Sequence, residues 1–205
     1  MGTAERRQRE AEERRNAILT AAKKVFWQRG YAKATMPQIA AEAELAAGTL
    51  YLYFPSKDAL YIELLSEGYD LLATRLRTAV REGGDALRVA ERLIDAFFAF
   101  AREFPEYFDA IFLILQREKK GWGRFPEEQI RRLEAKERAC LDIVAGVLER
   151  TQTGTAESRL QTVDAVWCML AGIVFYRHNR DSFDAMAREA KRLLISAVFG
   201  VGRTN

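Results

Sequence analysis

Apolar and polar positions along the chain repeat with the period of an α-helix. Between residues 18 and 26 the apolar side chains recur at helical spacing, namely Ile18, Leu19, Ala22, Val25 and Phe26, which predicts an amphipathic helix over residues 11–28. Similar patterns predict further helices over residues 36–44, 48–53, 57–81, 85–104, 105–119, 127–150, 159–178 and 182–199. Valine and isoleucine rarely alternate with polar residues, so we predict no strand and an all-α fold.

Prolines and capping residues set the expected helix boundaries. Each of the four prolines precedes a helical segment, and none falls inside one: Pro37, Pro55, Pro105 and Pro126. Thr35 and Gln38 have the spacing of a capping box, and Gly30 is placed to end the first helix in a left-handed conformation. Either Pro55 or Ser56 opens the helix that starts at Lys57.

One segment of the predicted helical chain is more uniformly apolar than the others. Residues 165–176 are apolar on almost every side of their helix, which predicts that this helix is buried all round. Residues 165–176 and residues 45–56 are the two longest stretches without a charged residue, and each has 12 residues. A membrane-spanning helix needs roughly 18 or more apolar residues, so we expect no such helix. The first 15 residues have no apolar core typical of a secretory signal. We therefore expect a soluble, cytoplasmic protein.

The positive charge of the chain is concentrated near its start. The 205 residues carry a formal net charge of +3, yet residues 1–57 alone hold 10 Lys and Arg against 6 Asp and Glu. This asymmetry favours an anionic partner for the N-terminal part, although the arginines of residues 1–15 also suit a solvated helix that balances its own glutamates. The only cysteines, Cys140 and Cys168, make neither a disulfide framework nor a zinc motif.

Two short helices within this basic quarter have the dimensions of a helix-turn-helix. Residues 45–47 are the expected turn between them, and the second helix starts with small residues that allow its backbone to approach a phosphate. At this point the chain resembles the DNA-binding region of TetR-family transcriptional regulators. The resemblance covers about residues 15–62 and rests above all on the run Gly-Thr-Leu-Tyr-Leu-Tyr-Phe-x-Ser-Lys-x-x-Leu over residues 48–60.

The resemblance implies a division of the chain and a set of contacts with DNA. Residues 1–56 would form a three-helix DNA-binding domain with a basic arm at 1–14, and residues 57–205 a helical effector-binding and dimerisation domain. The positions assigned to DNA are Thr35, Gln38, Ala46, Ala47, Gly48, Thr49, Tyr51, Leu52, Tyr53 and Lys57. For both tyrosines, packing between helices is the alternative, and Leu50 and Phe54 are expected in the core.

Three of these positions change the expected mode of DNA recognition. Ala46 stands where the family usually has a capping Ser or Thr, which costs about 1 kcal/mol of cap, and Ala47 replaces a residue that is often polar. We therefore expect phosphate contacts, apolar contacts and DNA shape to dominate over hydrogen bonds to bases. Leu52 is expected to be exposed in the free protein and to pack on a thymine methyl group.

The rest of the chain is expected to bind an effector and a second copy. The last two helices form the expected homodimer interface, and the small residues Ala171 and Gly172 suit either that interface or packing within one subunit. An apolar effector pocket is expected among the aromatics Phe97, Phe98, Phe104, Phe108, Phe112, Trp122, Trp167 and Tyr176. An ordinary aromatic core is the alternative.

An enzyme is the first rival hypothesis. With one histidine, His178, the chain has no histidine-rich metal site; this residue either caps a helix C-terminus or polarises an effector. No nucleophile elbow, P-loop or dinucleotide motif is present. We predict no catalytic residue, no metal and no cofactor. The sequence thus indicates a ligand-responsive regulator that binds a palindromic operator and a small apolar effector. The resemblance implies a repressor, since most regulators of this family are repressors. A dimeric architectural DNA-binding protein without an effector is the second rival.

Overall fold

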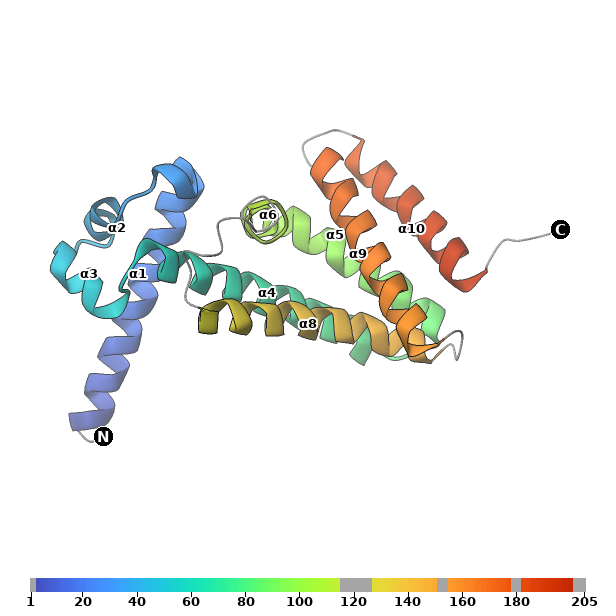
Figure 1. The fold of residues 1–205 in the computed structure, drawn as a ribbon, viewed down its shortest axis with the longest axis horizontal. Coiled ribbons are helices and arrows are strands. Elements are labelled where there is room, and N and C mark those ends of the chain that lie inside the picture. The colour runs from blue at the N-terminus through green and yellow to red at the C-terminus, as the bar shows by residue number, and fades with distance from the viewer. Residues whose placement is uncertain (1–2, 115–126, 151–154, 178–181, 201–205) are drawn as a thin grey trace. The chain divides into compact units, whose positions relative to one another are not determined.

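The computed structural model describes residues 3–114, 127–150, 155–177 and 182–200. Within them the chain is helical and contains no strand, as the sequence predicts (Figure 1). The helices are α1 (Thr3–Lys33), α2 (Met36–Glu42), α3 (Ala47–Tyr53), α4 (Lys57–Arg81), α5 (Ala86–Glu103), α6 (Pro105–Asp109), the π-helix η1 (Ala110–Ile114), α8 (Glu127–Glu149), α9 (Ala156–Arg177) and α10 (Phe183–Phe199).

The chain divides into two compact units, and α4 and α8 each contribute residues to both. The first unit runs through Glu67 and includes α8 as far as Leu133, and the second contains the rest of α4 and α8 together with α5, α6, η1, α9 and α10. The compact unit therefore extends beyond residue 56, where the sequence-based division places the boundary, because the first turns of α4 complete its core.

The first unit packs α2, α3 and the start of α4 against one face of α1. Ile18, Ile39, Leu50 and Leu60 are completely buried in this core. Helix α1 is longer than the predicted residues 11–28, because exposed turns without an apolar face precede its packed part. At Gly30 the helix kinks, with φ 73° and ψ 155°, so the glycine has the positive φ expected of it but not the ψ of a left-handed cap.

The second unit has an aromatic core built mainly by α5. Val89, Phe97 and Phe100 on this helix are 1% exposed or less. The side chain of Asp85 caps α5 by accepting a hydrogen bond from the Arg88 amide, at 2.8 Å. The prediction of one continuous α-helix from residue 105 is wrong, since a π-helical segment begins at Ala110 and residues 115–119 lie outside the described part.

Helix α9 corrects a second expectation. Cys168, Met169, Phe175 and Tyr176 are exposed, so the prediction that this helix is buried on every side is wrong for the single chain. The helices within the described ranges include none that is long and apolar enough to cross a lipid bilayer.

Candidate functional site

The entrance to the helix-turn-helix is fixed by a capping box. The Thr35 hydroxyl accepts a hydrogen bond from the Gln38 amide at 3.4 Å, and the Gln38 side-chain oxygen accepts one from the Thr35 amide at 3.1 Å. This reciprocal pair, predicted from the sequence, holds Thr35 exposed at the start of α2. The Gln38 oxygen is occupied by this bond, so capping is the role that the geometry gives to Gln38.

The turn between α2 and α3 lies slightly earlier than predicted. Helix α2 ends at Glu42 and α3 already begins at Ala47, so residues 43–46 form the turn. Glu44 has a φ of 56°, a left-handed conformation that is uncommon for residues other than glycine, asparagine and aspartate. The Leu45 amide donates to the Ala40 carbonyl at 2.9 Å, which closes the turn onto α2.

Helix α3 has a core face and an outward face. Leu50 and Phe54 are 0% and 3% exposed and anchor the helix in the first unit, as predicted. The opposite face consists of Ala47, Gly48, Tyr51 and Leu52, all exposed, with Thr49 and Tyr53 half-buried at its border. Leu52 is 84% exposed, which confirms the expectation for the free protein. A largely exposed leucine on a helix whose opposite face is packed in the core is suited to contact with a partner.

The N-terminus of α3 lacks a side-chain cap. Ala46 makes no side-chain hydrogen bond, as expected for alanine, and only its carbonyl joins the helix by accepting from the amides of Thr49 and Leu50. The first amides of α3 therefore donate no hydrogen bond to the side chain at the N-cap position.

Lys57 is held at the start of α4 by Tyr31. Its ammonium donates to the Tyr31 carbonyl at 2.9 Å and lies 4.4 Å from the centre of the Tyr31 ring, while the Tyr31 hydroxyl donates to Asp58. The Ser56 hydroxyl accepts from the Ala59 amide at 3.1 Å, so Ser56 rather than Pro55 caps α4. The predicted phosphate-binding lysine is thus held, half-buried, at the start of α4.

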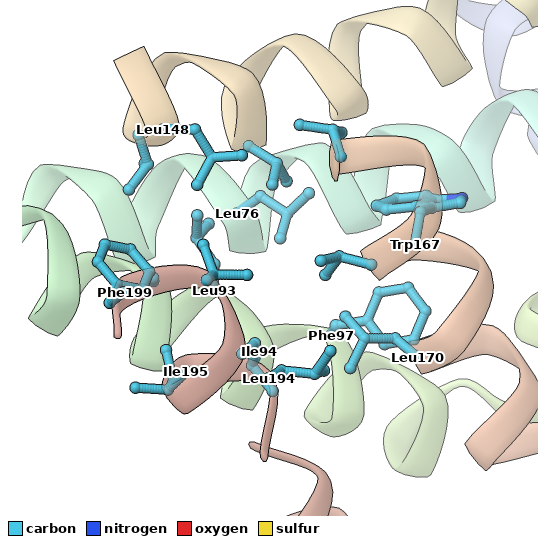
Figure 2. Close-up of a pocket in the computed structure, with 16 residues that line it drawn as sticks. Leu76, Leu93, Ile94, Phe97, Leu148, Trp167, Leu170, Leu194, Ile195 and Phe199 are labelled. Atoms are coloured by element: carbon cyan, nitrogen blue, oxygen red, sulfur yellow. The ribbon is translucent and has the colours of Figure 1, made fainter. Parts of the chain in front are cut away.

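The second unit contains a narrow apolar cavity of about 50 Å³ between α5, α8, α9 and α10, with Leu76 of α4 on one side (Figure 2). Its wall is wholly apolar apart from the indole nitrogen of Trp167. The lining residues are Leu76, Ala90, Leu93, Ile94, Phe97, Val144, Val147, Leu148, Val163, Val166, Trp167, Leu170, Leu194, Ile195, Val198 and Phe199. Of the predicted effector residues, Phe97 and Trp167 line the cavity.

Most of the other predicted effector residues belong to a packed aromatic core. The Phe97 ring lies 5.3–6.2 Å from the rings of Phe98, Phe108, Phe112 and Trp167, and Phe108 stacks on Phe112 with 4.5 Å between ring centres. None of Phe98, Phe108 and Phe112 lines the cavity, because their neighbours already fill the space around them.

The remaining three effector predictions fall elsewhere. The Phe104 ring lies under the Arg75 guanidinium, 5.1 Å away, and Tyr176 is 73% exposed on α9, so neither lines the cavity. Trp122 lies outside the described residues, as does His178. The sequence reasoning favoured aromatic side chains and therefore missed the aliphatic wall from α8 and α10, whose helical apolar stripes were the available signal.

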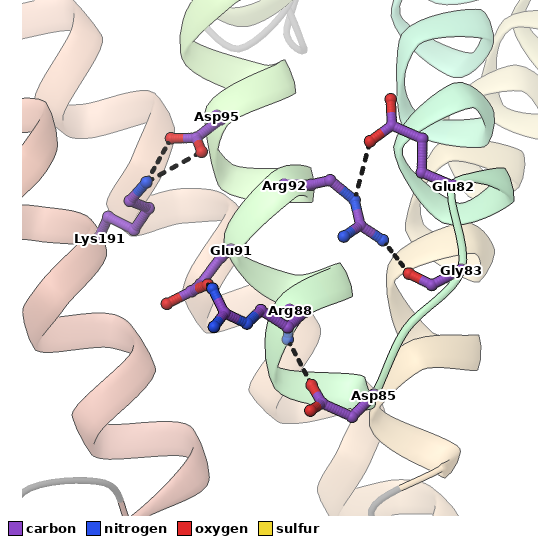
Figure 3. Close-up of polar contacts among 8 residues, drawn as sticks. All are labelled: Glu82, Gly83, Asp85, Arg88, Glu91, Arg92, Asp95 and Lys191. Carbon is purple, nitrogen blue, oxygen red and sulfur yellow. Dashed lines mark hydrogen bonds and ion pairs between the residues drawn. The ribbon is translucent and has the colours of Figure 1, made fainter.

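Charged groups near the start of α5 are paired with one another rather than directed into the cavity (Figure 3). The Arg92 side chain donates to the Ala79 and Gly83 carbonyls and forms an ion pair with Glu82 at 3.3 Å, so it ties α5 to the end of α4. Lys191 on α10 contacts Asp95 on α5 at 2.8 Å. No charged or polar residue is buried in the part of the chain that the structure describes.

An exposed apolar face runs along α9 and α10. Met169, Tyr176 and Leu193 are 48%, 73% and 53% exposed, and together with Gly172 and Met186 they border a shallow hollow between the two helices. Ala171 and Gly172 are half-buried, so backbone is accessible beside the larger side chains. Contiguous exposed apolar side chains of this kind are typical of protein interfaces.

Metal-ligating side chains and the buried thiol of Cys140 are the remaining chemically reactive groups of interest among the described residues. The described residues contain no group of three or more histidine, cysteine, aspartate or glutamate side chains that could hold a metal ion. Cys140 is completely buried, and burial raises the pKa of its thiol to about 12, so it remains a neutral thiol near neutral pH.

Comparison with known proteins gives a sequence match to a protein family within the first unit and a structural similarity to solved proteins over most of the chain. Residues 18–64 match the family of bacterial regulatory proteins described as the tetR family. An uncharacterized HTH-type transcriptional regulator, YuxN of Bacillus subtilis, is 38% identical over 80 residues, which are 39% of this chain and 27% of YuxN. The chain spans less than half the length of the curated relatives that it matches.

Solved structures extend the likeness to both units. The fatty acid degradation regulator FadR from Bacillus halodurans superposes with a TM-score of 0.73 at 18% identity, over 94% of this chain and 97% of FadR. FadR from Bacillus subtilis, solved in complex with stearoyl-CoA, superposes with a TM-score of 0.66 at 22% identity, over 88% of this chain and 97% of that one.

Proposed function

Because the chain carries a tetR-family DNA-binding domain over residues 18–64, we propose that it is a dimeric, ligand-responsive transcriptional regulator that is released from its operator by an apolar effector. The observation that supports this most directly is the outward face of α3, where Leu52 is 84% exposed on a helix anchored by Leu50. A short helix that is anchored in the core on one side and exposed on the other is suited to enter the major groove of DNA.

Recognition of DNA combines positioning contacts with apolar readout. Thr35 at the start of α2, Tyr53 at the end of α3 and Lys57 at the start of α4 contact phosphates, while Gly48 lets the α3 backbone approach the duplex closely. Thr49 and Leu52 carry the methyl groups that meet thymine methyls in the major groove. Because no charged side chain lies on α3, direct hydrogen bonding to bases contributes little to this specificity.

A second copy covers the exposed apolar face of α9 and α10. Two such faces related by a two-fold axis form a four-helix bundle, and Gly172 allows the helices to approach closely. The pairing accounts for α9, whose apolar sequence is buried on only one side in the single chain. A dimer of this kind has two copies of α3, as binding to two half-sites about one DNA turn apart requires.

The effector occupies the cavity of the second unit. An alkyl chain suits its wall, which offers no charged group, and stearoyl-CoA in the similar FadR structure is a ligand with such a chain. At about 50 Å³ the cavity has room for only a few water molecules, whereas sites for small ligands measure about 300–1,000 Å³. Effector binding therefore requires the surrounding helices to separate, which links occupancy to a change of conformation.

The energy required for this switch is within reach of such a ligand. Inverting an operator-competent population from 99:1 to 1:99 takes about 5.5 kcal/mol of differential effector binding. At about 25 cal/mol per Å², burying about 220 Å² more apolar surface in the released state supplies it. Helix α4 contributes residues to both units and carries the change from one to the other.

Selection of binding sequences from a random DNA pool tests the DNA-binding part of this proposal. We expect a palindrome with half-sites about one turn apart, and addition of acyl compounds of increasing chain length to the protein–operator complex should then release the DNA. The variant Val166→Phe, which fills the cavity, should bind the same operator and resist release. Steep salt dependence without a selected sequence would instead indicate an architectural DNA-binding protein, and turnover of the acyl probe an enzyme.

A further inference from the structure

The N-terminal turns of α1 form a helix that no neighbouring element covers. All residues from 4 to 14 are exposed, and these turns extend past α3 toward the N-terminus (Figure 1). Isolated helices gain little stability from propensity alone, so an uncovered extension of this length is notable. Its distribution of charge indicates what it meets.

Most of the arginines in this extension are neutralised within the protein. Arg6 pairs with Glu10 at 2.9 Å and Arg9 with Glu13 at 3.8 Å, each one turn along the helix. Arg15 pairs with Glu63 of α4 at 2.9 Å. These pairs account for three of the five arginines between residues 3 and 17.

The other two arginines lie together on one face. Arg7 and Arg14 make no ion pair or hydrogen bond with any residue that the structure describes. Seven residues apart, they lie on the same side of the helix, about 10.5 Å apart along its axis. Glu5 and Glu12, also seven residues apart, lie about 140–180° around the helix from them. The extension therefore has a cationic face with free guanidinium groups and an acidic back.

This cationic face begins beside the end of the recognition helix. The Arg15 guanidinium lies 4.9 Å from the centre of the Phe54 ring, and Phe54 is the C-terminal cap of α3. Between the two free arginines the face carries Ala11 and Glu10, and the Glu10 carboxylate is paired with Arg6 at 2.9 Å, so the guanidinium groups of Arg7 and Arg14 are the uncompensated charges of this face. The face has no large apolar side chain for insertion into a lipid bilayer, whereas arginine at the surface of a helix is well suited to phosphates.

We propose that residues 4–14 form a second DNA contact, in which Arg7 and Arg14 bind phosphates flanking the half-site read by α3. The inference rests on the DNA-binding function proposed above and adds a partner surface outside the residues that match the family, which begin at residue 18. Contacts of this kind increase affinity and lengthen the footprint without changing the base preference.

The test compares two double variants that remove the same charge from the same helix. Arg7→Gln with Arg14→Gln should lower the slope of log K against log salt by about 1.8 per protomer, or about 3.6 for a dimer on its operator, since each phosphate contact contributes about 0.9. Hydroxyl-radical protection should also be lost at the outer edge of each half-site, with the selected sequence unchanged. Arg6→Gln with Arg9→Gln is the matched control and should keep both the protected edge and most of the slope.

The outcomes separate this inference from the function on which it rests. If the Arg7 and Arg14 double variant keeps the slope and footprint of the wild type, or if both double variants lose them equally, the second contact does not exist and only general charge acts. If the wild-type protein selects no DNA sequence, the proposed regulatory function itself fails.

Discussion

Gly48 offers a test in which the stability of the free protein and its affinity for DNA should change in opposite directions. The residue is the second of α3 and lies on the exposed face of that helix. Its φ is not positive, and a Cβ atom built on it meets no atom within 4 Å. Nothing in the free chain therefore requires glycine at this position.

Replacing Gly48 with alanine should stabilise the isolated protein. Glycine within a helix costs about 0.5–1 kcal/mol relative to alanine, and the lower value applies here because Gly48 lies in the first turn. A gain of about 0.5 kcal/mol corresponds to a melting temperature raised by about 1–2 °C in a chain of this size.

The same substitution should weaken operator binding. A methyl group between the α3 backbone and the duplex prevents the closest approach and removes a hydrogen bond to a charged phosphate, which is worth about 1.5–3 kcal/mol. At about 1.4 kcal/mol per tenfold change, Gly48→Ala should raise Kd by about 10-fold to 150-fold. Thermal unfolding and fluorescence anisotropy with a labelled operator measure the two quantities.

Gly146 in α8 provides the matched control. Its Cβ position is also free of neighbours within 4 Å, and the residue lies outside the DNA-binding unit. Gly146→Ala should therefore raise stability by about 0.5–1 kcal/mol and leave Kd unchanged. Full operator affinity in Gly48→Ala would refute the close-approach argument, and a lower melting temperature would refute the packing argument.

Three further substitutions test the packing. Leu50→Ala removes the completely buried anchor of α3 and should cost about 2–5 kcal/mol in urea denaturation, whereas a loss below about 1 kcal/mol would contradict the assigned core. Gly68→Ala places a Cβ 2.8 Å from Ile111 Cδ1 and 2.9 Å from Tyr107 Cδ1. The resulting overpacking should cost about 1–3 kcal/mol of stability, which outweighs the gain in helix propensity. A rise in melting temperature like that of Gly146→Ala would show that α4 is not tightly packed at this point. Burial raises the pKa of the Cys140 thiol from 9.0 to about 12, so the unfolded chain loses this proton at lower pH than the folded chain, and the free energy of unfolding should fall between pH 9 and pH 12 by at most about 1.4 kcal/mol per pH unit. Cys140→Ala should show a smaller fall between pH 9 and pH 10.5. Equal slopes for the two proteins would exclude the thiol as the cause.

Features that depend on neighbouring residues in the chain were predictable. The bounds of α4 agree with the predicted 57–81, and the Thr35–Gln38 capping box is present, because both follow from helical periodicity and from groups three residues apart. The exposure of Leu52 and the burial of Leu50 follow in the same way from their places around one short helix.

The start of α1 is a local feature that the apolar pattern missed, because its exposed arginine turns lack an apolar stripe and are supported by ion pairs between residues four apart. Features that depend on distant segments were not predictable. An aromatic side chain in the sequence does not reveal whether its partners will fill the space around it: Phe108 and Phe112 stack on each other, whereas Phe97 reaches the cavity.

The helical character of the described residues, the helix-turn-helix and the side chains that α3 turns toward solvent could all be predicted from the amino-acid order, because each depends on interactions within a few turns of helix. The position of the space in the second unit and the uncovered side of α9 emerge only from the packing of the helices. An apolar helix carries the same pattern whether it packs within one chain or against another, and that choice depends on the volumes and positions of α5, α8 and α10 around it.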